Sequence, residues 1–413
     1  MTVAIDRRLL LNIDWLLLGT SLTLACIGLA LIASATRTRQ EPPSVQVVAN
    51  APDAATAERA TAAQARRAPQ WVKQAGWMAL GCIAFLVVIA IDYRRLADRA
   101  PLLYVAAATM LAGLLLFGHS IAGTRRWLTL GSLQLQPSEP AKLIAALVVA
   151  RAFAESRKDS LDLRDLIGPG VATAVLALLI ALEPDLGTAF CLVPMFFAAA
   201  FLGGLRPRAL VVLALVLVLG AGGLGWAFAK GYQRRRVVSH VAPYINPDGW
   251  LGRQLARYVH IEPRASDHRG AGYQSRQSRI AVGSGGFLGR GYGQGGQSQL
   301  GYLPARHTDF IFSVLAEETG FVGVSLTLAL YLTLFWRMFE TARRARDRLG
   351  ALLVAGLASM LTFQVIYNIA MVAGLVPVKG LPLPLLSYGG SSTLSAFMAI
   401  GLILNVRMRR FAN

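Results

Sequence analysis

The sequence has few charged residues and few cysteines. Asp, Glu, Lys and Arg together make up 15% of its 413 residues, whereas hydrophobic residues make up 55%. One water-soluble core of this length would not bury so much apolar surface, so an ordinary soluble domain is excluded and lipid is the favoured solvent. The 3 cysteines, Cys26, Cys82 and Cys191, all fall in apolar runs. We expect them to be reduced core residues, and they imply neither a disulfide framework nor a metal cluster.

Long apolar runs fill most of the chain. A helix needs roughly 20 apolar residues to cross the hydrocarbon of a bilayer. About ten runs approach that length, and they predict an all-α polytopic membrane protein with a single transmembrane domain over residues 1–413. The expected spans are 15–33, 74–91, 101–118, 137–154, 166–182, 187–204, 209–228, 310–336, 350–375 and 391–406. Ala33-Ser34-Ala35 resembles a signal-peptide cleavage site, but the run before it is longer than a signal core, so we expect an uncleaved first span.

The distribution of arginine and lysine indicates the orientation. With both termini cytoplasmic, the predicted inner segments carry 19 of these cations. The short outer loops after the third, fifth and ninth spans carry only Arg125, Arg126 and Lys379. Because cytoplasmic loops are enriched in Arg and Lys, we expect both termini inside. The formal charge of +19 is partly this topological signal, and it does not indicate nucleic-acid binding.

Two predicted outer loops are long. Residues 34–73 are rich in Ala, Pro, Thr, Gln and Arg, and we interpret them as a flexible loop. Residues 229–308 form a large extracytoplasmic loop with twelve cations, which topology does not explain because long loops cross the membrane regardless of charge. Eleven glycines lie in 270–301. Residues 273–282 are either a short interfacial helix, with Arg276 and Arg279 on one side, or a solvated amphipathic turn.

Several ionisable residues lie in or beside predicted spans, where an unpaired charge is costly. Glu139 and Lys142, three residues apart, share a helix face and form either a structural ion pair or a carboxylate and a cation in a water-filled cavity. Glu183 and Asp185 form an acidic turn that is equally consistent with a helix cap. Asp309 follows Thr308, which resembles an N-cap, so we expect Asp309 in the first turn of the eighth span. It is placed either to complement the helix dipole or to act as a general base.

Two further features concern the last spans. Glu317 and Glu318, two turns beyond Asp309, are expected to reach polar partners inside the bundle. Residues 379–392 combine prolines that prevent a regular helix with glycines and hydroxyl groups. Non-helical backbone at membrane depth is tolerated only within protein or beside a cavity, so this stretch predicts a buried re-entrant turn.

Six short motifs, in order along the chain, resemble the SEDS (shape, elongation, division and sporulation) family of cell-wall polymerases. They are Arg125-Arg-Trp127, Gln136-Pro-Ser-Glu139, Glu183-Pro-Asp-Leu-Gly187, Gln297-Ser-Gln-Leu300, His307-Thr-Asp-Phe310 and Pro384-Leu-Leu-Ser-Tyr-Gly-Gly-Ser391. Arg306 before His307 and the Gln297 motif resemble the elongation branch of the family more than the division branch. The chain departs from the family in its longer first outer loop and in Glu183, which stands where glutamine is common.

The resemblance implies a peptidoglycan glycosyltransferase that joins lipid II disaccharides into glycan strands during cell elongation and cell-shape maintenance. It places the chain in the bacterial inner (cytoplasmic) membrane, with its active site on the extracytoplasmic face. A class B penicillin-binding protein that crosslinks the product is the implied partner, together with other membrane proteins of the elongation complex.

The family motifs also suggest roles for individual residues. Asp309 matches the essential acid of the family and is the expected catalytic base. Glu139 and Lys142 match its pair in the fourth span. The residues expected to bind or support the substrate are Glu139, Lys142, Arg306, His307, Thr308, Arg126, Asp185, Gln297 and Ser387. A divalent cation, Mg²⁺ or Mn²⁺, is left open, and no metal ligand is identified.

Two other classes of function remain as alternatives. Many spans with intramembrane charges are also typical of a transporter, which here would be a lipid II flippase. Against this, the sequence shows no internal repeat, and the informative residues lie toward the predicted outer side. The third alternative is a non-catalytic scaffold of the cell-wall synthesis complex.

Overall fold

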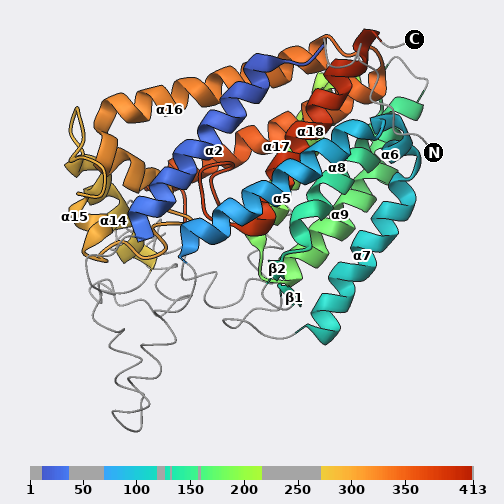
Figure 1. Ribbon diagram of the computed structural model, residues 1–413. Coiled ribbons are helices and arrows are strands. Elements are labelled where there is room, and N and C mark those ends of the chain that lie inside the picture. The colour runs from blue at the N-terminus through green and yellow to red at the C-terminus, as the bar shows by residue number, and fades with distance from the viewer. Residues whose placement is uncertain are drawn as a thin grey trace.

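The fold, obtained as a computed structural model, is a bundle of long helices (Figure 1). The structure describes residues 12–36, 69–118, 126–130, 133–156, 160–215 and 271–411. The predicted loop 34–73 therefore lies largely outside the described residues, as do residues 216–270, which include most of the seventh predicted span and the first half of the large loop.

Seven helical segments are long and apolar enough to cross a membrane. They are α2 (Trp15–Thr36), α5 (Gln70–Ala90), α7 (Ala100–Phe117), the short helix η1 (Leu163–Leu166) continued by α9 (Ile167–Leu182), α16 (Ile311–Arg343), α17 (Arg348–Val372) and α18 (Gly390–Met408). Each coincides with a span expected from the sequence. The multi-span membrane architecture is thus confirmed.

Two further expected spans form helices of lower apolarity or length. Helix α8 (Ser138–Glu155) has 18 residues but carries charged side chains near both ends. Helix α10 (Leu186–Leu202) has 17 residues and contains Pro194. Residues 207–215 are helical where the seventh span is expected to begin. The short helices α6 (Tyr93–Asp98) and η3 (Arg409–Phe411) precede α7 and follow α18.

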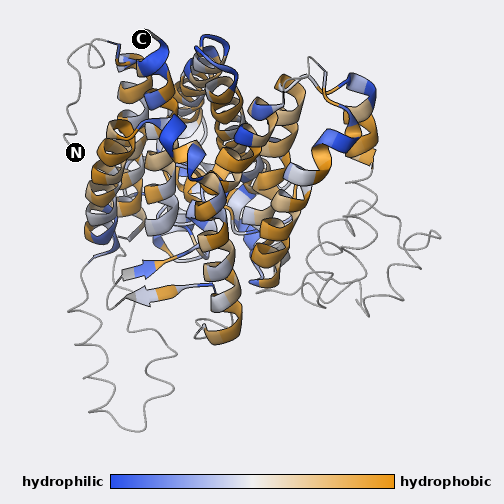
Figure 2. Ribbon diagram, turned by 90° about the vertical axis from the view of Figure 1, so that its right-hand side faces the viewer, coloured by the Kyte–Doolittle hydropathy of each residue, from blue (hydrophilic) through white to orange (hydrophobic). Residues whose placement is uncertain are grey.

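Burial separates central helices from peripheral ones. In the apolar stretches of α17 and α18, 67% and 83% of residues are buried, whereas the figure for α5 is 17% and for α7 is 22%. Helix α18 packs against α5, and α17 packs against α8, α10 and α16. The apolar surface that α5 and α7 leave uncovered suits lipid contact, and apolar residues line the helices along most of their length (Figure 2). The helices therefore form a core around α17 and α18 with apolar outer walls.

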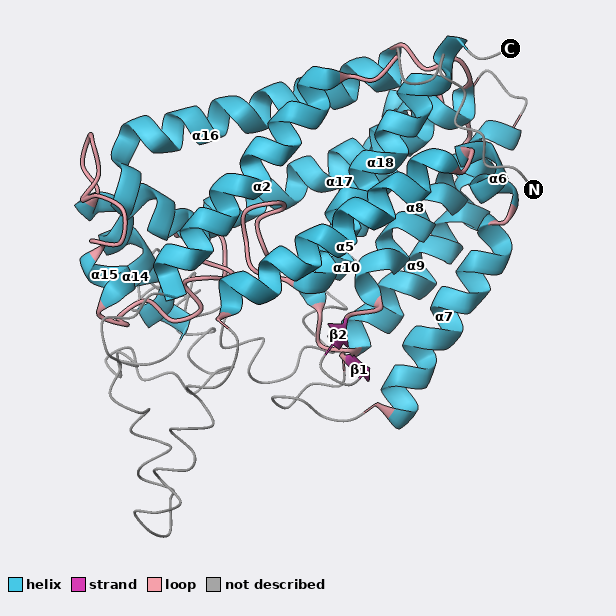
Figure 3. Cartoon of the chain, viewed as in Figure 1, coloured by secondary structure: helices cyan, strands magenta, loops and turns pink. Residues whose placement is uncertain are grey.

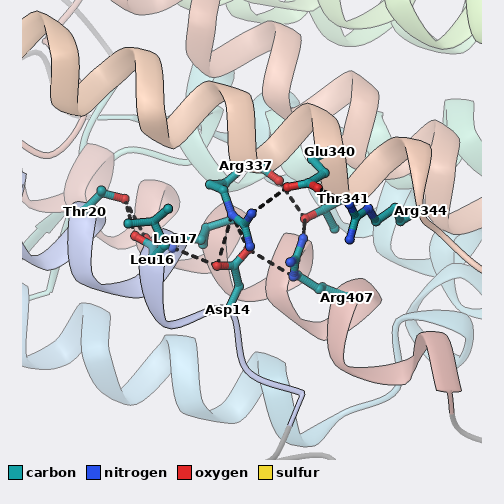
Figure 4. Close-up of polar contacts among 9 residues, drawn as sticks. All are labelled: Asp14, Leu16, Leu17, Thr20, Arg337, Glu340, Thr341, Arg344 and Arg407. Carbon is teal, nitrogen blue, oxygen red and sulfur yellow. Dashed lines mark hydrogen bonds and ion pairs between the residues drawn. The ribbon is translucent and has the colours of Figure 1, made fainter.

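A buried ionic network joins three helices at one end of the bundle (Figure 4). Asp14, just before α2, pairs with Arg337 of α16 at 2.9 Å and with Arg407 of α18 at 3.0 Å. Glu340 pairs with Arg337 and with Arg344, each at 2.6 Å. Asp14 also accepts a hydrogen bond from the backbone N–H of Leu17, so it caps α2 as well. Since a buried carboxylate needs such partners, the network defines how the start of α2 meets the other two helices.

The opposite end of the bundle carries the irregular elements (Figure 3). Strands β1 (Leu128–Leu130) and β2 (Leu133–Leu135) form an antiparallel hairpin that the sequence analysis did not predict. Helix α14 (Ala271–Ser284) confirms a helix over residues 273–282, with Arg276 and Arg279 both exposed. It is followed by a glycine-rich turn, residues 285–295, and by α15 (Gly296–Gln299).

The glycine-rich turn lies against a kink in α16. Gly320 has a φ of 63° inside that helix, and a Cβ added there would lie 2.2 Å from the backbone nitrogen of Gly289. The backbone N–H of Phe321 donates to the carbonyl of Gly286 at 2.9 Å. Only glycine permits both this backbone conformation and this approach. The glycines of this turn therefore serve helix packing.

Residues 375–389 are non-helical and largely buried, as the prolines predict. Leu381, Leu383 and Leu386 are each at most 1% exposed. The hydroxyl of Tyr331 donates to the carbonyl of Pro384, and Gly28 of α2 faces Leu385 and Leu386. Irregular backbone is here enclosed by protein, which satisfies the requirement for such a segment within a membrane domain.

The cysteines are free thiols, as expected, but they are not all core residues. Cys191 is buried and Cys82 is partly buried, whereas Cys26 is exposed on α2. The expectation for Cys26 was wrong because an apolar run gives no sign of which of its faces meets lipid.

Candidate functional site

Asp309 lies in the turn that leads into α16. The helix begins at Ile311 with Phe310 as its N-cap, so Asp309 precedes the first helical turn. The hydroxyl of Thr308 donates to the carbonyl of Ala305 at 3.2 Å and caps nothing. The predictions that Thr308 is an N-cap and that Asp309 lies in the first turn were therefore wrong. Ala305 has a φ of 50°, so the backbone turns just before Thr308. The helix therefore begins later, at Ile311.

The backbone around Asp309 is held by two polar side chains. The amide of Asn368, on α17, donates to the carbonyl of Asp309 at 2.9 Å and to that of Leu381 at 2.7 Å. The hydroxyl of Ser387 donates to the carbonyl of Thr308 at 2.6 Å and accepts from the backbone N–H of Leu383 at 2.8 Å. These bonds attach the turn before α16 to the non-helical segment 375–389, called the proline-rich segment from here on. The half-buried Asp309 carboxyl thus stands on a rigid support.

His307 and Arg306 flank the same turn. The ring of His307 meets the edge of Tyr388 at a centroid distance of 5.6 Å, and the backbone N–H of Tyr388 donates to the carbonyl of His307 at 2.9 Å. Burial lowers the pKa of His307, and the charge of Arg306 lowers it further. Arg306 donates from Nε to the carbonyl of Ala35 at 2.8 Å, at the end of α2. Arg306, His307 and Thr308 are thus all beside Asp309, with His307 favouring its neutral form at neutral pH.

Glu139 and Lys142 form a buried ion pair. Their charged atoms are 3.2 Å apart, and the residues are 3% and 1% exposed. A cavity of about 10 Å³ beside them, lined by Gln364, Ser392 and Ser395 among others, has room for about one water. Of the two interpretations left open, the structure shows the ion pair. Lys142 is enclosed by its neighbours here and does not face an open, water-filled cavity.

Asp185 organises the start of α10. Its carboxyl accepts from the backbone N–H of Thr188 at 3.2 Å, which makes it the N-cap of that helix. It also accepts from the side chains of Gln136 at 2.6 Å and Ser138 at 3.1 Å, which precede and begin α8. The helix-cap interpretation of Asp185 is confirmed. Through these hydrogen bonds, Asp185 links the α9–α10 turn to the Gln136 motif.

Residues 379–381 lie between Asp309 and the start of α10. A Cβ added to Gly380, whose φ is 66°, would be 3.5 Å from Oδ2 of Asp309. On the other side, a Cβ added to Gly187 would be 3.0 Å from the carbonyl oxygen of Lys379. The ammonium group of Lys379 lies 4.9 Å from the centre of the Phe190 ring of α10. The acid, a cation and a helix N-terminus therefore meet around one short segment.

Glu183 and Arg126 lie beside this region with polar atoms unsatisfied. Glu183 is 0% exposed, and within the described part of the chain neither of its carboxyl oxygens has a hydrogen-bond partner. The same holds for the buried Nε of Arg126, whose guanidinium lies 5.7 Å from the Trp127 ring centre. Burial raises the pKa of Glu183 to about 8; Asp185 adds to the rise and Arg126 opposes it.

Gln297 has a different role from the other predicted site residues. It lies in α15, where its backbone N–H donates to Glu317 at 2.7 Å; that of Ser298 donates to the same carboxyl at 3.1 Å. Glu318 accepts from the hydroxyl of Ser34. The expectation that both glutamates reach polar partners is confirmed. Gln297 is therefore placed with the glycine-rich turn and the kinked part of α16.

The described part of the chain contains no group of three or more His, Cys, Asp or Glu side chains that could hold a metal ion. The carboxyl of Asp185 is occupied by hydrogen bonds, and that of Glu139 by Lys142. These residues therefore do not make up a complete donor set for Mg²⁺ or Mn²⁺, which prefer several oxygen ligands.

Sequence reasoning missed Asn368, Gly380 and Tyr388. Asn368 had a signal, because an amide within an apolar span requires polar partners. The nearness of Gly380 and Tyr388 to the Asp309 turn had none. It arises from contacts between segments about 70 to 80 residues apart.

The chain is similar to known proteins along most of its length. A family model described as FTSW_RODA_SPOVE, cell cycle protein, matches residues 53–411. Peptidoglycan glycosyltransferase MrdB of Escherichia coli (strain K12) is 38% identical over 347 residues, which cover 82% of this chain and 85% of MrdB.

Two solved structures share the fold. A chain from a structure described as "Structural coordination of polymerization and crosslinking by a peptidoglycan synthase complex" aligns with a TM-score of 0.73 and 30% identity, covering 97% of this chain and 99% of that chain. The rod shape determining protein RodA of Thermus thermophilus aligns with a TM-score of 0.63 and 29% identity, covering 97% of this chain and 98% of that chain. This chain belongs to the FTSW_RODA_SPOVE family, which is the SEDS family that its motifs resemble.

Proposed function

We propose that this protein is a peptidoglycan glycosyltransferase that polymerises lipid II into glycan strands, with Asp309 as the general base. The observation that carries the proposal is the setting of Asp309. The backbone carbonyls of Asp309 and Thr308 accept hydrogen bonds from Asn368 and Ser387, and the half-buried carboxyl stands at the end of the bundle beside Gly380 and the start of α10. The names of MrdB and of the synthase complex support this reaction class.

In the proposed reaction the Asp309 carboxylate removes the proton from the 4-hydroxyl of an acceptor GlcNAc. The oxygen then attacks the anomeric carbon of the donor glycan, and the bond from that carbon to the pyrophosphate breaks with inversion. Undecaprenyl pyrophosphate leaves with the bonding electron pair. Because this leaving group is stable as an anion, the second carboxylic acid that glycosidases use to protonate theirs is not needed.

The leaving group requires positive charge more than it requires an acid. Among the described residues, Arg126 and Lys379 lie near the proposed site, as does the N-terminus of α10, whose amide groups favour anions. Lys142 contributes from a distance, because it is buried against Glu139. A divalent cation shared with the diphosphates remains a proposal, which loss of activity with a chelator and its recovery on adding Mg²⁺ or Mn²⁺ would support.

The setting of the reaction follows from the same proposal. Lipid II becomes available to polymerases on the outer face of the bacterial inner membrane, so we place the Asp309 end of the bundle there. A class B penicillin-binding protein is the proposed partner, supported by the likeness to a synthase complex that coordinates polymerization with crosslinking. The relation to a rod shape determining protein supports a role in elongation and cell shape.

The test is a gel assay with purified protein, labelled lipid II, and the partner present or absent. We expect glycan ladders that resist moenomycin, and their loss with Asp309→Asn although lipid II still binds. Asp98→Asn, an exposed acid at the other end of the bundle, is the matched control and should leave the ladders intact. Ladders of normal length from Asp309→Asn would contradict the base assignment. Failure of the unaltered protein with its partner would favour a flippase or a scaffold.

A further inference from the structure

Glu183 is a buried acidic residue in the three-residue turn between α9 and α10. Neither of its carboxyl oxygens has a hydrogen-bond partner among the residues that the structure describes. An ionised carboxylate in such a place would lose its hydration without hydrogen bonds to replace it. A neutral carboxylic acid loses far less. The geometry therefore suits the protonated form of this side chain.

Charged groups of the Glu183 turn and of the segments packed near it come from four elements. Asp185 shares its turn, and Arg126 approaches from the segment before β1; these two act on it directly. From α8, Lys142 faces Asp185 and is paired with Glu139. From the segment after α17, Lys379 lies over Phe190. Asp185 is already bonded to Thr188, Gln136 and Ser138, and Lys142 to Glu139. Within the described residues, Arg126 keeps a buried donor, its Nε, without a hydrogen-bond partner.

We propose that Glu183 is a positioning residue that holds a proton at neutral pH and thereby leaves Arg126 available to an anionic diphosphate. When Glu183 loses this proton, its carboxylate draws Arg126 into an ion pair, and the site loses one positive charge. The proton passes to solvent, so the exchange needs no other reactant. This inference rests on the proposed function, because the anion it concerns is the diphosphate of lipid II.

The direction of the pH effect follows from the protonation state. The pKa of Glu183 is raised to about 8, chiefly by burial, so the neutral acid predominates below that pH and the carboxylate above it. Lipid II affinity is therefore expected to be high at neutral pH and to fall in alkaline solution. If only the neutral form leaves Arg126 free, the Kd should rise about tenfold between about pH 7 and about pH 9.

The experiment measures binding of lipid II to full-length protein in nanodiscs, in an Asp309→Asn background that prevents turnover. With Glu183 intact, the Kd for lipid II should rise about tenfold between about pH 7 and about pH 9. Glutamine has the same shape as glutamic acid and never ionises. With Glu183→Gln the ratio of the two Kd values should therefore be about one. Arg126→Gln should bind weakly at both pH values. Glu155→Gln, an exposed glutamate paired with Arg151 at the other end of α8, is the control and should keep the tenfold rise.

A second measurement is independent of the substrate. Infrared difference spectra of the full chain should show a protonated carboxyl band that disappears at alkaline pH and is absent from Glu183→Gln. Equal pH ratios for the intact and Glu183→Gln proteins, or no such band, would overturn the inference. Absence of lipid II binding at every pH would instead overturn the proposed function, and the infrared titration would then decide alone whether Glu183 carries the proton.

Discussion

At the scale of single residues, one amide supports the proposed catalytic acid. Asn368 donates both hydrogens of its side-chain nitrogen, one to the carbonyl of Asp309 and one to that of Leu381. It is fully buried on α17. Because it bonds both the backbone of Asp309 and that of Leu381, which follows Gly380, it links the acid to the segment that separates it from α10.

Replacing Asn368 with leucine should therefore damage catalysis as well as folding. Two buried carbonyl groups lose their donors, at about 1–3 kcal/mol each, and the Asp309 turn is released. We expect kcat for glycan synthesis to fall roughly tenfold or more, because small displacements of a catalytic group are costly. Thr362→Val on the same helix is the control, since its hydroxyl has no hydrogen-bond partner among the residues described in the structure. Equal kcat values for the two variants would show that Asn368 does not position the acid.

At the scale of elements, glycine allows a helix to pack directly against irregular backbone. Gly28 of α2 faces the buried proline-rich segment, and a Cβ added there would lie 2.6 Å from the carbonyl oxygen of Leu385. No side chain other than hydrogen fits this contact. Helix α2 therefore holds in place the same segment that supports Asp309 through Ser387.

Gly28→Ala should lower the stability of the bundle by about 1–3 kcal/mol, the usual cost of overpacking. The measurement is the unfolding temperature of purified protein in detergent. Gly19→Ala on the same helix is the matched control, because nothing lies within 4 Å of its added Cβ. An unchanged unfolding temperature for Gly28→Ala would mean that the proline-rich segment shifts without cost.

The glycine-rich turn is attached to α16 by a carboxylate. Glu317 is 0% exposed and accepts from two backbone amides at the start of α15. Glu317→Ala should raise the hydrogen-exchange rate of residues 296–299 while leaving that of α17 unchanged, because the change removes only this local attachment. Ser284→Ala, which removes a weaker contact of 3.4 Å to the same carboxyl, should have a smaller effect. Equal exchange in the intact and Glu317→Ala proteins would contradict this role.

At the scale of the whole molecule, the two ends of the bundle are held by different means. The Asp309 end relies on hydrogen bonds between loops and on close contacts at glycine. The other end relies on charge, with Asp14 compensating Arg337 and Arg407 across three helices (Figure 4). The candidate site is thus built from irregular backbone at one end of helices that ion pairs anchor at the other.

Asp14→Asn should destabilise the whole bundle, because it leaves two arginines without their shared carboxylate. Removal of one partner from a buried ionic group costs about 3–5 kcal/mol, and here Glu340 compensates Arg337 in part. Glu155→Gln breaks an exposed pair and should cost at most about 0.5 kcal/mol. Thermal unfolding in nanodiscs measures both. Similar unfolding temperatures for the two variants would refute the anchoring role.

The sequence by itself determined the membrane class, the approximate helices and the candidate acid. Apolar runs of about 20 residues have one stable form in lipid, so their bounds follow from local composition. Short motifs such as His307-Thr-Asp-Phe310 point to the chemistry without any coordinates. The β1–β2 hairpin and the true start of α16 were beyond this reasoning, because short strands and helix caps depend on neighbours distant in the chain.

Only the tertiary structure decided which side chains meet. It placed Asn368, Gly380 and Ser387 around the Asp309 turn and assigned Gln297 to the glycine-rich turn. It also placed Lys142 in a buried ion pair with Glu139. Glu183 is buried without a hydrogen-bond partner among the described residues. Burial and hydrogen bonding arise from packing among helices far apart in sequence, and no local pattern records them.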